Sequence, residues 1–179
     1  MRIISGKNKG RKIITPSNLP VRPTTDFAKE ALFNILSNQL QLDGLEVLDL
    51  FAGTGNISYE FISRNVKKVL AVDNNYNCTK FIQQTADKLN YKNLFVIRAD
   101  YKAFIKHTEM KWDLIFADPP YNMEEVENLP YVIFEKQLIK PKGMLILEHK
   151  KSTNLSQFPH FSDHRVYGNV NFSFFIEDK

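Results

Sequence analysis

An acid, two prolines and a tyrosine follow an apolar run in the second half of the chain. The run spans residues 114–117 and reads Leu-Ile-Phe-Ala, and Asp118-Pro119-Pro120-Tyr121 comes directly after it. Because proline has no N–H and fixes φ, a strand that reaches these residues must end and turn away from the sheet. The turn gathers a carboxylate, backbone carbonyls and an aromatic face, which together suit a planar substrate with an amino group. The alternative is an ordinary tight turn, since Asp and Pro are common in turns.

A turn with two glycines follows an earlier apolar run. Residues 49–56 read Asp-Leu-Phe-Ala-Gly-Thr-Gly-Asn, and the glycines would let the backbone approach a ligand at the carboxyl end of a strand. Asp73 lies 20 residues after Gly53, a spacing typical of an acid that accepts hydrogen bonds from ribose hydroxyls. Asp100 ends the next predicted strand, where its carboxylate could meet an adenine amino group. We therefore expect four acids at one edge of a sheet, unless each only caps the helix that follows it: Asp49, Asp73, Asp100 and Asp118.

These acids favour one class of nucleotide ligand over another. A dinucleotide site generally has a third glycine so that the helix N-terminus meets the pyrophosphate, and this chain has Ser58 there. A ring of carboxylates also repels phosphate. S-adenosylmethionine has a ribose, an adenine and two cationic groups but no phosphate, and we predict it as the cofactor.

The elements that must position these residues form a repeating pattern. Short apolar runs alternate with helical stretches, which is typical of βαβ units and of a parallel sheet covered on both faces. Near the C-terminus two β-prone runs flank Gly168-Asn169 and predict an antiparallel hairpin. The expected fold is one α/β domain with about seven strands. The predicted strands span 47–51, 69–72, 94–97, 114–117, 144–147, 161–167 and 170–176, and the predicted helices 57–64, 77–89, 101–107 and 124–138.

The first 45 residues are expected to form an extension of the same domain, whose α/β part spans residues 46–179. Two isoleucine pairs flank a stretch rich in Gly, Asn and Lys, which predicts a β-hairpin with a basic tip. A helix of about three turns should follow, with Thr24 or Thr25 as its cap and Asp26 at its positive end. Its apolar positions repeat at helical spacing from Phe27 to Leu36.

The positive charge of the chain is concentrated at its N-terminus. The chain has 24 Lys and Arg against 20 Asp and Glu, a net charge of +4, but residues 1–25 hold six of the cations and none of the acids. A basic segment on a slightly acidic body favours a polyanionic partner such as RNA, although chance clustering would give the same pattern. Arg22 could instead form a structural ion pair. The cations assigned to RNA binding are Lys7, Lys9, Arg11, Lys12 and Arg22.

Composition limits the remaining possibilities. The 179 residues are 43% hydrophobic and 25% charged, as in a globular domain. No apolar run approaches the ~18 residues of a membrane span, and the N-terminus has no long apolar core of a signal peptide. Cys78 is the single cysteine, which excludes an internal disulfide. We expect a cytoplasmic protein with no membrane partner and no metal site, because His160 and His164 follow Pro159 in strand or loop rather than on a helix.

Several of these motifs together resemble a known family. The pair formed by residues 49–55 and 118–121 resembles the class I S-adenosylmethionine-dependent methyltransferases that act on exocyclic amino nitrogens. Within that class, residues 1–6 (Met-Arg-Ile-Ile-Ser-Gly), 10–12, 22–26 (Arg-Pro-Thr-Thr-Asp) and 30–36 (Glu-Ala-Leu-Phe-Asn-Ile-Leu) are similar to the RsmD family. The resemblance covers most of the chain and implies a Rossmann-like fold and methylation of the 2-amino group of one guanine in bacterial small-subunit (16S) ribosomal RNA, free or in an assembled particle.

The resemblance also implies roles for individual residues. The catalytic assignment is Asp118, Pro119 and Tyr121, and the cofactor-binding assignment is Asp49, Phe51, Gly53, Thr54, Gly55, Asp73, Asn74, Asp100 and Tyr101. Thr54 stands where the family commonly has Ser, and Asp73 where it often has Glu; neither change removes a chemical role. Two alternatives stay open: amino methylation of adenine or of a glutamine side chain, and a non-catalytic RNA-binding assembly factor.

Overall fold

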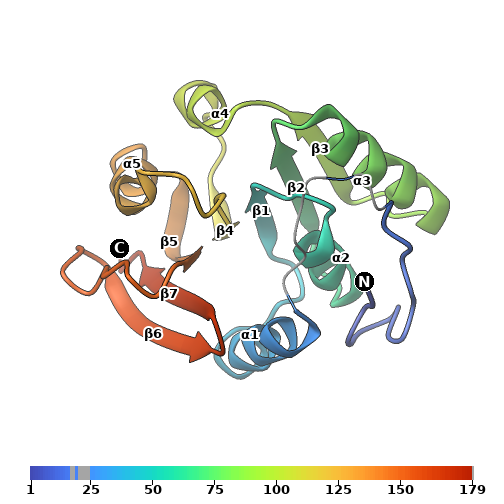
Figure 1. Ribbon diagram of the computed structural model, residues 1–179, viewed down its shortest axis with the longest axis horizontal. Coiled ribbons are helices and arrows are strands. Elements are labelled where there is room, and N and C mark those ends of the chain that lie inside the picture. Colours follow the sequence, from blue (N-terminus) through green and yellow to red (C-terminus); the bar gives the residue numbers. More distant parts are fainter. Residues whose placement is uncertain (17–18, 20–24, 179) are drawn as a thin grey trace.

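The computed structural model describes residues 1–16, 19 and 25–178. Its centre is a seven-stranded sheet in the order β3-β2-β1-β4-β5-β7-β6 (Figure 1). The first five strands run parallel, and β7 is antiparallel to both of its neighbours. This confirms the predicted mostly parallel sheet with a C-terminal hairpin. The strands are β1 (Glu46–Leu50), β2 (Lys68–Asp73), β3 (Leu94–Arg98), β4 (Trp112–Ala117), β5 (Ile139–His149), β6 (Phe161–Tyr167) and β7 (Val170–Ile176).

Helices cover both faces of this sheet. On one face lie α1 (Asp26–Gln39), α2 (Asn56–Ser63) and α3 (Tyr76–Leu89), and on the other α4 (Tyr101–His107) and α5 (Leu129–Glu135) (Figure 1). Alternate residues of each strand enter the two cores: Val47 packs with α1 to α3, whereas Leu48 packs with α4 and α5. The central strands are therefore buried on both faces, which explains why they read as continuous apolar runs.

The largest differences from the predicted elements lie around β4 and β5. The predicted helix over 124–138 was wrong: a 3-10 turn (Val126–Asn128) leads into α5, which has Pro130 in its first turn. Gln137 has a φ of 52°, in the left-handed region, so a helix cannot continue through it. β5 begins at Ile139, five residues earlier than predicted, and its pairing with β4 shifts register between Trp112 and Leu114.

The N-terminal residues fold back on themselves and dock on α2. Arg2 and Lys12 form a single antiparallel bridge rather than two full strands, while Ile3 and Ile13 are buried in the core. The turn between them reaches the last residue of α2: the Lys7 N–H donates to the Ser63 carbonyl at 2.8 Å. Gly6 has a φ of +83°, and a Cβ there would lie 2.0 Å from the same Ser63 oxygen. Only glycine fits this contact.

The start of α1 confirms the predicted cap. Thr25 Oγ1 accepts a hydrogen bond from the Ala28 N–H at 3.2 Å, and Asp26 lies in the first turn. Thr24 and Arg22 lie outside the described residues. Within the described part of the chain, no helix combines the length and apolar character needed to cross a membrane.

Candidate active site

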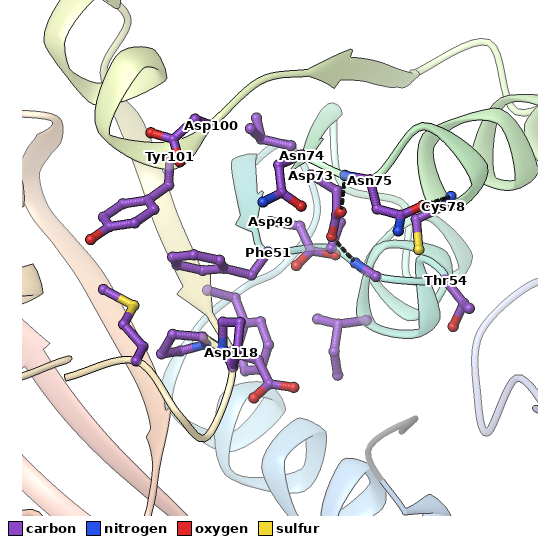
Figure 2. Close-up of a pocket in the computed structure, with 18 of the residues that line it drawn as sticks. Asp49, Phe51, Thr54, Asp73, Asn74, Asn75, Cys78, Asp100, Tyr101 and Asp118 are labelled. Atoms are coloured by element: carbon purple, nitrogen blue, oxygen red, sulfur yellow. Dashed lines mark hydrogen bonds between the residues drawn. The ribbon is translucent and has the colours of Figure 1, made fainter. Parts of the chain in front are cut away.

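A cavity of about 520 Å³ lies at the carboxyl edge of the parallel strands. Its walls come from the segments that follow β1, β2, β3 and β4 (Figure 2). The structure brings together every predicted catalytic and cofactor-binding residue except Gly55 at this cavity. Its lining includes Asp49, Phe51, Gly53, Thr54, Asp73, Asn74, Asp100, Tyr101, Asp118, Pro119 and Tyr121.

The two glycines of the turn after β1 have different tasks. Gly53 has a φ of 54° and its N–H donates to Asp73 Oδ2 at 2.8 Å, so it joins the turn to the end of β2. Gly55 has a φ of +79° and begins α2. A Cβ at Gly55 would lie 2.9 Å from the Tyr59 ring and 3.1 Å from Ile82. Gly55 therefore adopts the left-handed conformation that precedes α2, and its lack of a side chain lets α2 pack closely on α3.

Two of the four acids at the strand ends also hold local backbone. Asp100 Oδ1 accepts from the backbone N–H groups of Lys102 and Ala103, which is the geometry of a helix N-cap. Asp73 accepts from Gly53 through one oxygen and from the Asn75 N–H through the other, each at 2.8 Å. Burial raises the pKa of the Asp73 carboxyl, and these two N–H donors oppose the shift. The capping alternative thus describes part of what Asp100 does, whereas Asp73 holds the glycine turn and Asn75, and Asn75 itself caps α3.

Asp49 and Asp118 are different, because neither caps a helix. Asp49 is buried and accepts a hydrogen bond from the Ser58 hydroxyl. Burial raises the pKa of Asp49 to about 7, although the hydrogen bond from Ser58 acts to lower it. The charge of Asp73 raises this pKa further. The pKa of Asp118 is also raised to about 7, mainly by burial and to a smaller extent by the charge of Asp49. These two carboxyls hold negative charge poorly as long as no cation lies beside them.

Aromatic rings border the side of the cavity opposite the Asp73 contacts. Phe51 has a φ of 69°, which takes the chain out of β1 and turns the ring into the cavity. The Phe51 and Tyr101 ring centroids are 4.9 Å apart, and Figure 2 shows the Phe51 ring between Tyr101 and the carboxylates of Asp49 and Asp73. The Asp118 side chain points from this group toward α1 (Figure 2). Tyr121 is 46% exposed at the rim.

The described lining residues carry charge of one sign only. Four Asp residues line the cavity, and the described residues around it include no Lys, Arg or His. A pyrophosphate would meet uncompensated repulsion here, whereas a ligand with cationic groups and hydroxyl donors would gain from each carboxylate. In the described part of the chain, no group of three or more His, Cys, Asp or Glu residues is arranged to hold a metal ion.

A buried lysine that sequence reasoning missed supports the first residue of α2. Lys29 is 1% exposed, and its Nζ donates to the Arg2 carbonyl at 2.6 Å and to Asn56 Oδ1 at 2.8 Å. The same ammonium lies 3.2 Å from Glu60 Oε1. Asn56 lines the cavity. Lys29 therefore connects α1 and the N-terminal segment to the wall of the site.

Further lining residues were also missed, although the sequence carries a signal for one of them. Asn75 follows β2 and its side chain accepts from the N–H groups of Asn77 and Cys78, so an Asn before a helical stretch marked the turn. Cys78, Asn122 and Met123 also line the cavity. Nothing in their spacing distinguishes them from ordinary helix and loop residues.

The predicted RNA-binding cations lie away from this cavity. Lys7, Lys9, Arg11 and Lys12 are exposed, and Arg22 lies outside the described residues. The turn that carries Lys7 and Lys9 contacts Ser63, whereas Asn56 at the other end of α2 lines the cavity. An eight-residue helix is about 12 Å long. The N-terminal turn and the cavity therefore lie at opposite ends of α2.

The chain matches a family model, curated relatives and solved structures. A family model described as conserved hypothetical protein 95 matches residues 1–176. The chain is 33% identical over 155 residues to ribosomal RNA small subunit methyltransferase D of Buchnera aphidicola subsp. Acyrthosiphon pisum, covering 86% of this chain and 80% of the relative. It is 30% identical over 159 residues to the Haemophilus influenzae protein of the same name, covering 87% and 81%. The solved structure of yhhF from Escherichia coli matches with a TM-score of 0.88 and 21% identity over 100% of this chain and 98% of that one, which shows a shared fold.

Proposed function

Because this chain belongs to the RsmD family, described as conserved hypothetical protein 95, we propose that it methylates the 2-amino group of a guanine in small-subunit ribosomal RNA. The observation that carries this proposal is the position of Asp118 and Pro119 in a cavity with four carboxylates and no described cation. The relatives from Buchnera aphidicola subsp. Acyrthosiphon pisum and from Haemophilus influenzae, 33% and 30% identical, are named ribosomal RNA small subunit methyltransferase D, which supports the choice of polymer.

S-adenosylmethionine fits the chemistry of this lining, and when bound it supplies the methyl group. Asp73 and Asp100 offer acceptors for its ribose and adenine, since each carboxylate oxygen can accept a further hydrogen bond beside the backbone bonds described above. Phe51 and Tyr101 offer apolar faces for the adenine ring. Asp49, behind the glycine turn, adds negative charge for the cationic groups. Gly53 and Thr54 complete the turn around the ligand.

Asp118 and Pro119 orient the amine. The lone pair of a guanine 2-amino group is delocalised into the ring, so the nitrogen is a poor nucleophile until its geometry changes. Acceptance of its two N–H bonds by the Asp118 carboxylate and the Pro119 carbonyl would aim the lone pair at the reacting carbon. Most of the rate increase would come from this positioning and from exclusion of water. The Asp118 charge would also stabilise positive charge that develops on nitrogen.

A base must leave its helix to reach this pocket, because Asp118 lies inside the cavity and not on the outer surface. Tyr121 is exposed at the rim and would stack on the extruded base, an interaction worth ~1–3 kcal/mol per base.

The test is product analysis. The protein is incubated with methyl-labelled S-adenosylmethionine and, in separate reactions, with small-subunit particles, naked ribosomal RNA or DNA, and the product is digested to nucleosides. We expect label in N2-methylguanosine from one of the RNA substrates. Label in methyladenosine would overturn the guanine assignment. Absence of transfer together with tight RNA binding would favour an assembly factor.

Asp118→Asn is expected to lower the rate of methyl transfer at least ~100-fold, because the amide keeps an acceptor oxygen but loses the negative charge that stabilises positive charge on the nitrogen. Cofactor affinity, measured by calorimetry, should change less than about threefold, since the proposed role is toward the amine. Asp87→Asn is the matched control, because Asp87 is an exposed acid on α3 outside the cavity. Loss of both transfer and cofactor binding in Asp118→Asn would make Asp118 a cofactor residue instead.

Joint replacement of Lys7, Lys9, Arg11 and Lys12 by Gln should flatten the salt dependence of RNA binding. Removing one phosphate contact reduces the slope of log K against log salt by roughly 0.9 for a duplex and 0.7 for a single strand. The control replaces four exposed lysines elsewhere and changes the charge equally: Lys106, Lys111, Lys136 and Lys151. Equal slopes in the two variants would remove the N-terminal turn from the RNA contact surface.

A further inference from the structure

A second hollow lies between the N-terminal segment and α3, separate from the cavity. It encloses about 340 Å³ and shares no lining residue with the site at the strand ends. One wall is the segment 11–14 and the other is the outer side of α3. The lining residues are Arg11, Lys12, Ile13, Ile14, Phe81, Gln84, Thr85, Lys88 and Leu89. We call this hollow the α3 groove.

The floor of the α3 groove is apolar. Ile13 is 8% exposed, and Phe81 is half-buried and packs against the core under the sheet. Ile14 stands beside them with 90% of its surface exposed. An exposed isoleucine next to a half-buried phenylalanine leaves apolar area in contact with water, which marks a surface suited to a ligand with a flat apolar face.

The rim of the groove is basic on both walls. Arg11 and Lys12 approach from the N-terminal segment and Lys88 from α3, and none of the described lining residues is acidic. The nearest acid on the same helix turn is Asp87, whose carboxylate accepts from the Gln83 amide at 2.9 Å outside the groove. Gln84 adds a side chain that both donates and accepts hydrogen bonds.

From this combination we infer that the α3 groove binds one unpaired nucleotide of the RNA substrate. This inference rests on the proposed function, because it takes RNA to be the polymer that the protein binds. The base lies against Phe81 and Ile13, the Gln84 amide meets its edge, and Arg11, Lys12 and Lys88 hold its phosphates. A flat base with an anionic backbone matches an apolar slot with cations on both walls, as in other single-strand sites. The volume is at the lower end of ~300–1,000 Å³ for ligand pockets, the range of a small ligand such as one nucleotide.

This nucleotide is not the methylation target. The two sites share no lining residue and lie along different parts of α3: Cys78 near its start lines the cavity, whereas Phe81 and the later residues Gln84, Thr85, Lys88 and Leu89 line the groove. The groove therefore fixes the register of the strand that flanks the target, and the N-terminal segment contributes a defined subsite in addition to diffuse charge.

The test compares two lysines of the same helix. Lys88→Gln and Lys80→Gln remove the same charge from exposed positions of α3, but only Lys88 lines the groove. We expect Lys88→Gln to raise the RNA dissociation constant about three- to tenfold and to reduce the salt slope by about one phosphate contact, while Lys80→Gln stays near the wild type. Phe81→Leu keeps an apolar floor but removes the aromatic face, and it should weaken RNA binding about fivefold or more. Cofactor affinity should stay unchanged in all three.

Photocrosslinking of 4-thiouridine-substituted substrate RNA provides a readout that does not depend on variant stability. Crosslinked peptides should map to residues 11–14 or 81–89. If Lys88→Gln and Lys80→Gln behave alike, or crosslinks avoid both segments while the wild type still methylates RNA, the groove inference is overturned and the proposed function stands. A wild type that methylates no RNA would instead refute the proposed function.

Discussion

At the scale of single residues, the most informative pair is Asp49 and Asp118. Asp49 is buried and Asp118 is partly buried, each has the charge of another carboxylate nearby, and the pKa of each is raised to about 7. A carboxylate with a raised pKa is charged only above that value. The acceptor function that we propose for Asp118 is therefore present above pH 7 and is lost as the pH falls.

The expected pH profile follows from this shift. Between pH 8 and pH 6, kcat/KM for S-adenosylmethionine, which reports the groups of the cofactor-free enzyme, should decrease, approaching about tenfold per pH unit below the apparent pKa. Asp49→Asn removes the neighbouring charge and should move the midpoint of the profile to lower pH. The measurement is the initial rate at subsaturating substrate, with thermal unfolding at each pH as the check on folding. A flat profile over this range would contradict the assignment of Asp118.

The sequence was sufficient to predict most of this site, for a simple reason. Polar residues at the carboxyl ends of parallel strands meet at one sheet edge, so Asp73 and Asp100 could be placed together from spacing alone. Lys29 could not be predicted as buried from its residue type, since lysines on surface helices are normally solvated. Its spacing to Leu32, Phe33 and Leu36 places it within the apolar stripe of α1, and this was the signal available.

At the scale of the element, the start of α2 shows what a glycine contributes. Gly55 and Gly44 both have left-handed φ angles, +79° and +84°, but only Gly55 has close neighbours at the Cβ position. Alanine at Gly44 should cost about 1–2 kcal/mol from backbone strain alone. Alanine at Gly55 adds a contact of 2.9 Å with Tyr59, so Gly55→Ala should be clearly less stable than Gly44→Ala in urea denaturation. Equal stabilities would show that Tyr59 moves away freely.

Helices and strands could be predicted from the sequence where nearby residues determine their bounds, and less well where distant residues do. α4 has the predicted bounds because Asp100 caps it and Tyr101–His107 continues without a breaker. α5 was predicted too long because Glu124 to Glu127 favour a helix start, whereas Pro130 and the left-handed Gln137 limit it to seven residues. The position of β7 between β5 and β6 depends on long-range pairing, which no local pattern encodes.

At the scale of the whole molecule, Lys29 joins three parts of the chain. Its ammonium contacts the Arg2 carbonyl, Asn56 at the start of α2 and Glu60 further along that helix. Lys29→Met keeps the apolar stem but leaves these acceptors without their shared cation. We expect a loss of about 3 kcal/mol in the free energy of unfolding, as for other broken buried ion pairs.

The control for this variant is Glu30→Gln, an exposed neighbour on the same helix. Its free energy of unfolding in urea should stay within about 0.5 kcal/mol of the wild type. A change below about 1 kcal/mol in Lys29→Met would mean that Arg64, which also pairs with Glu60, compensates for the missing ammonium.

The place of β7 in the sheet has a consequence for synthesis of the protein. β7 lies between β5 and β6, so β5 has an open edge until the chain has been made through Ile176, 27 residues after His149. At roughly 5–20 residues per second, this edge is unpaired for about 1–5 s on the ribosome. An apolar strand such as β5 can pair with other nascent chains during that interval. Efficient production of this protein should therefore depend on translation speed through its last hairpin.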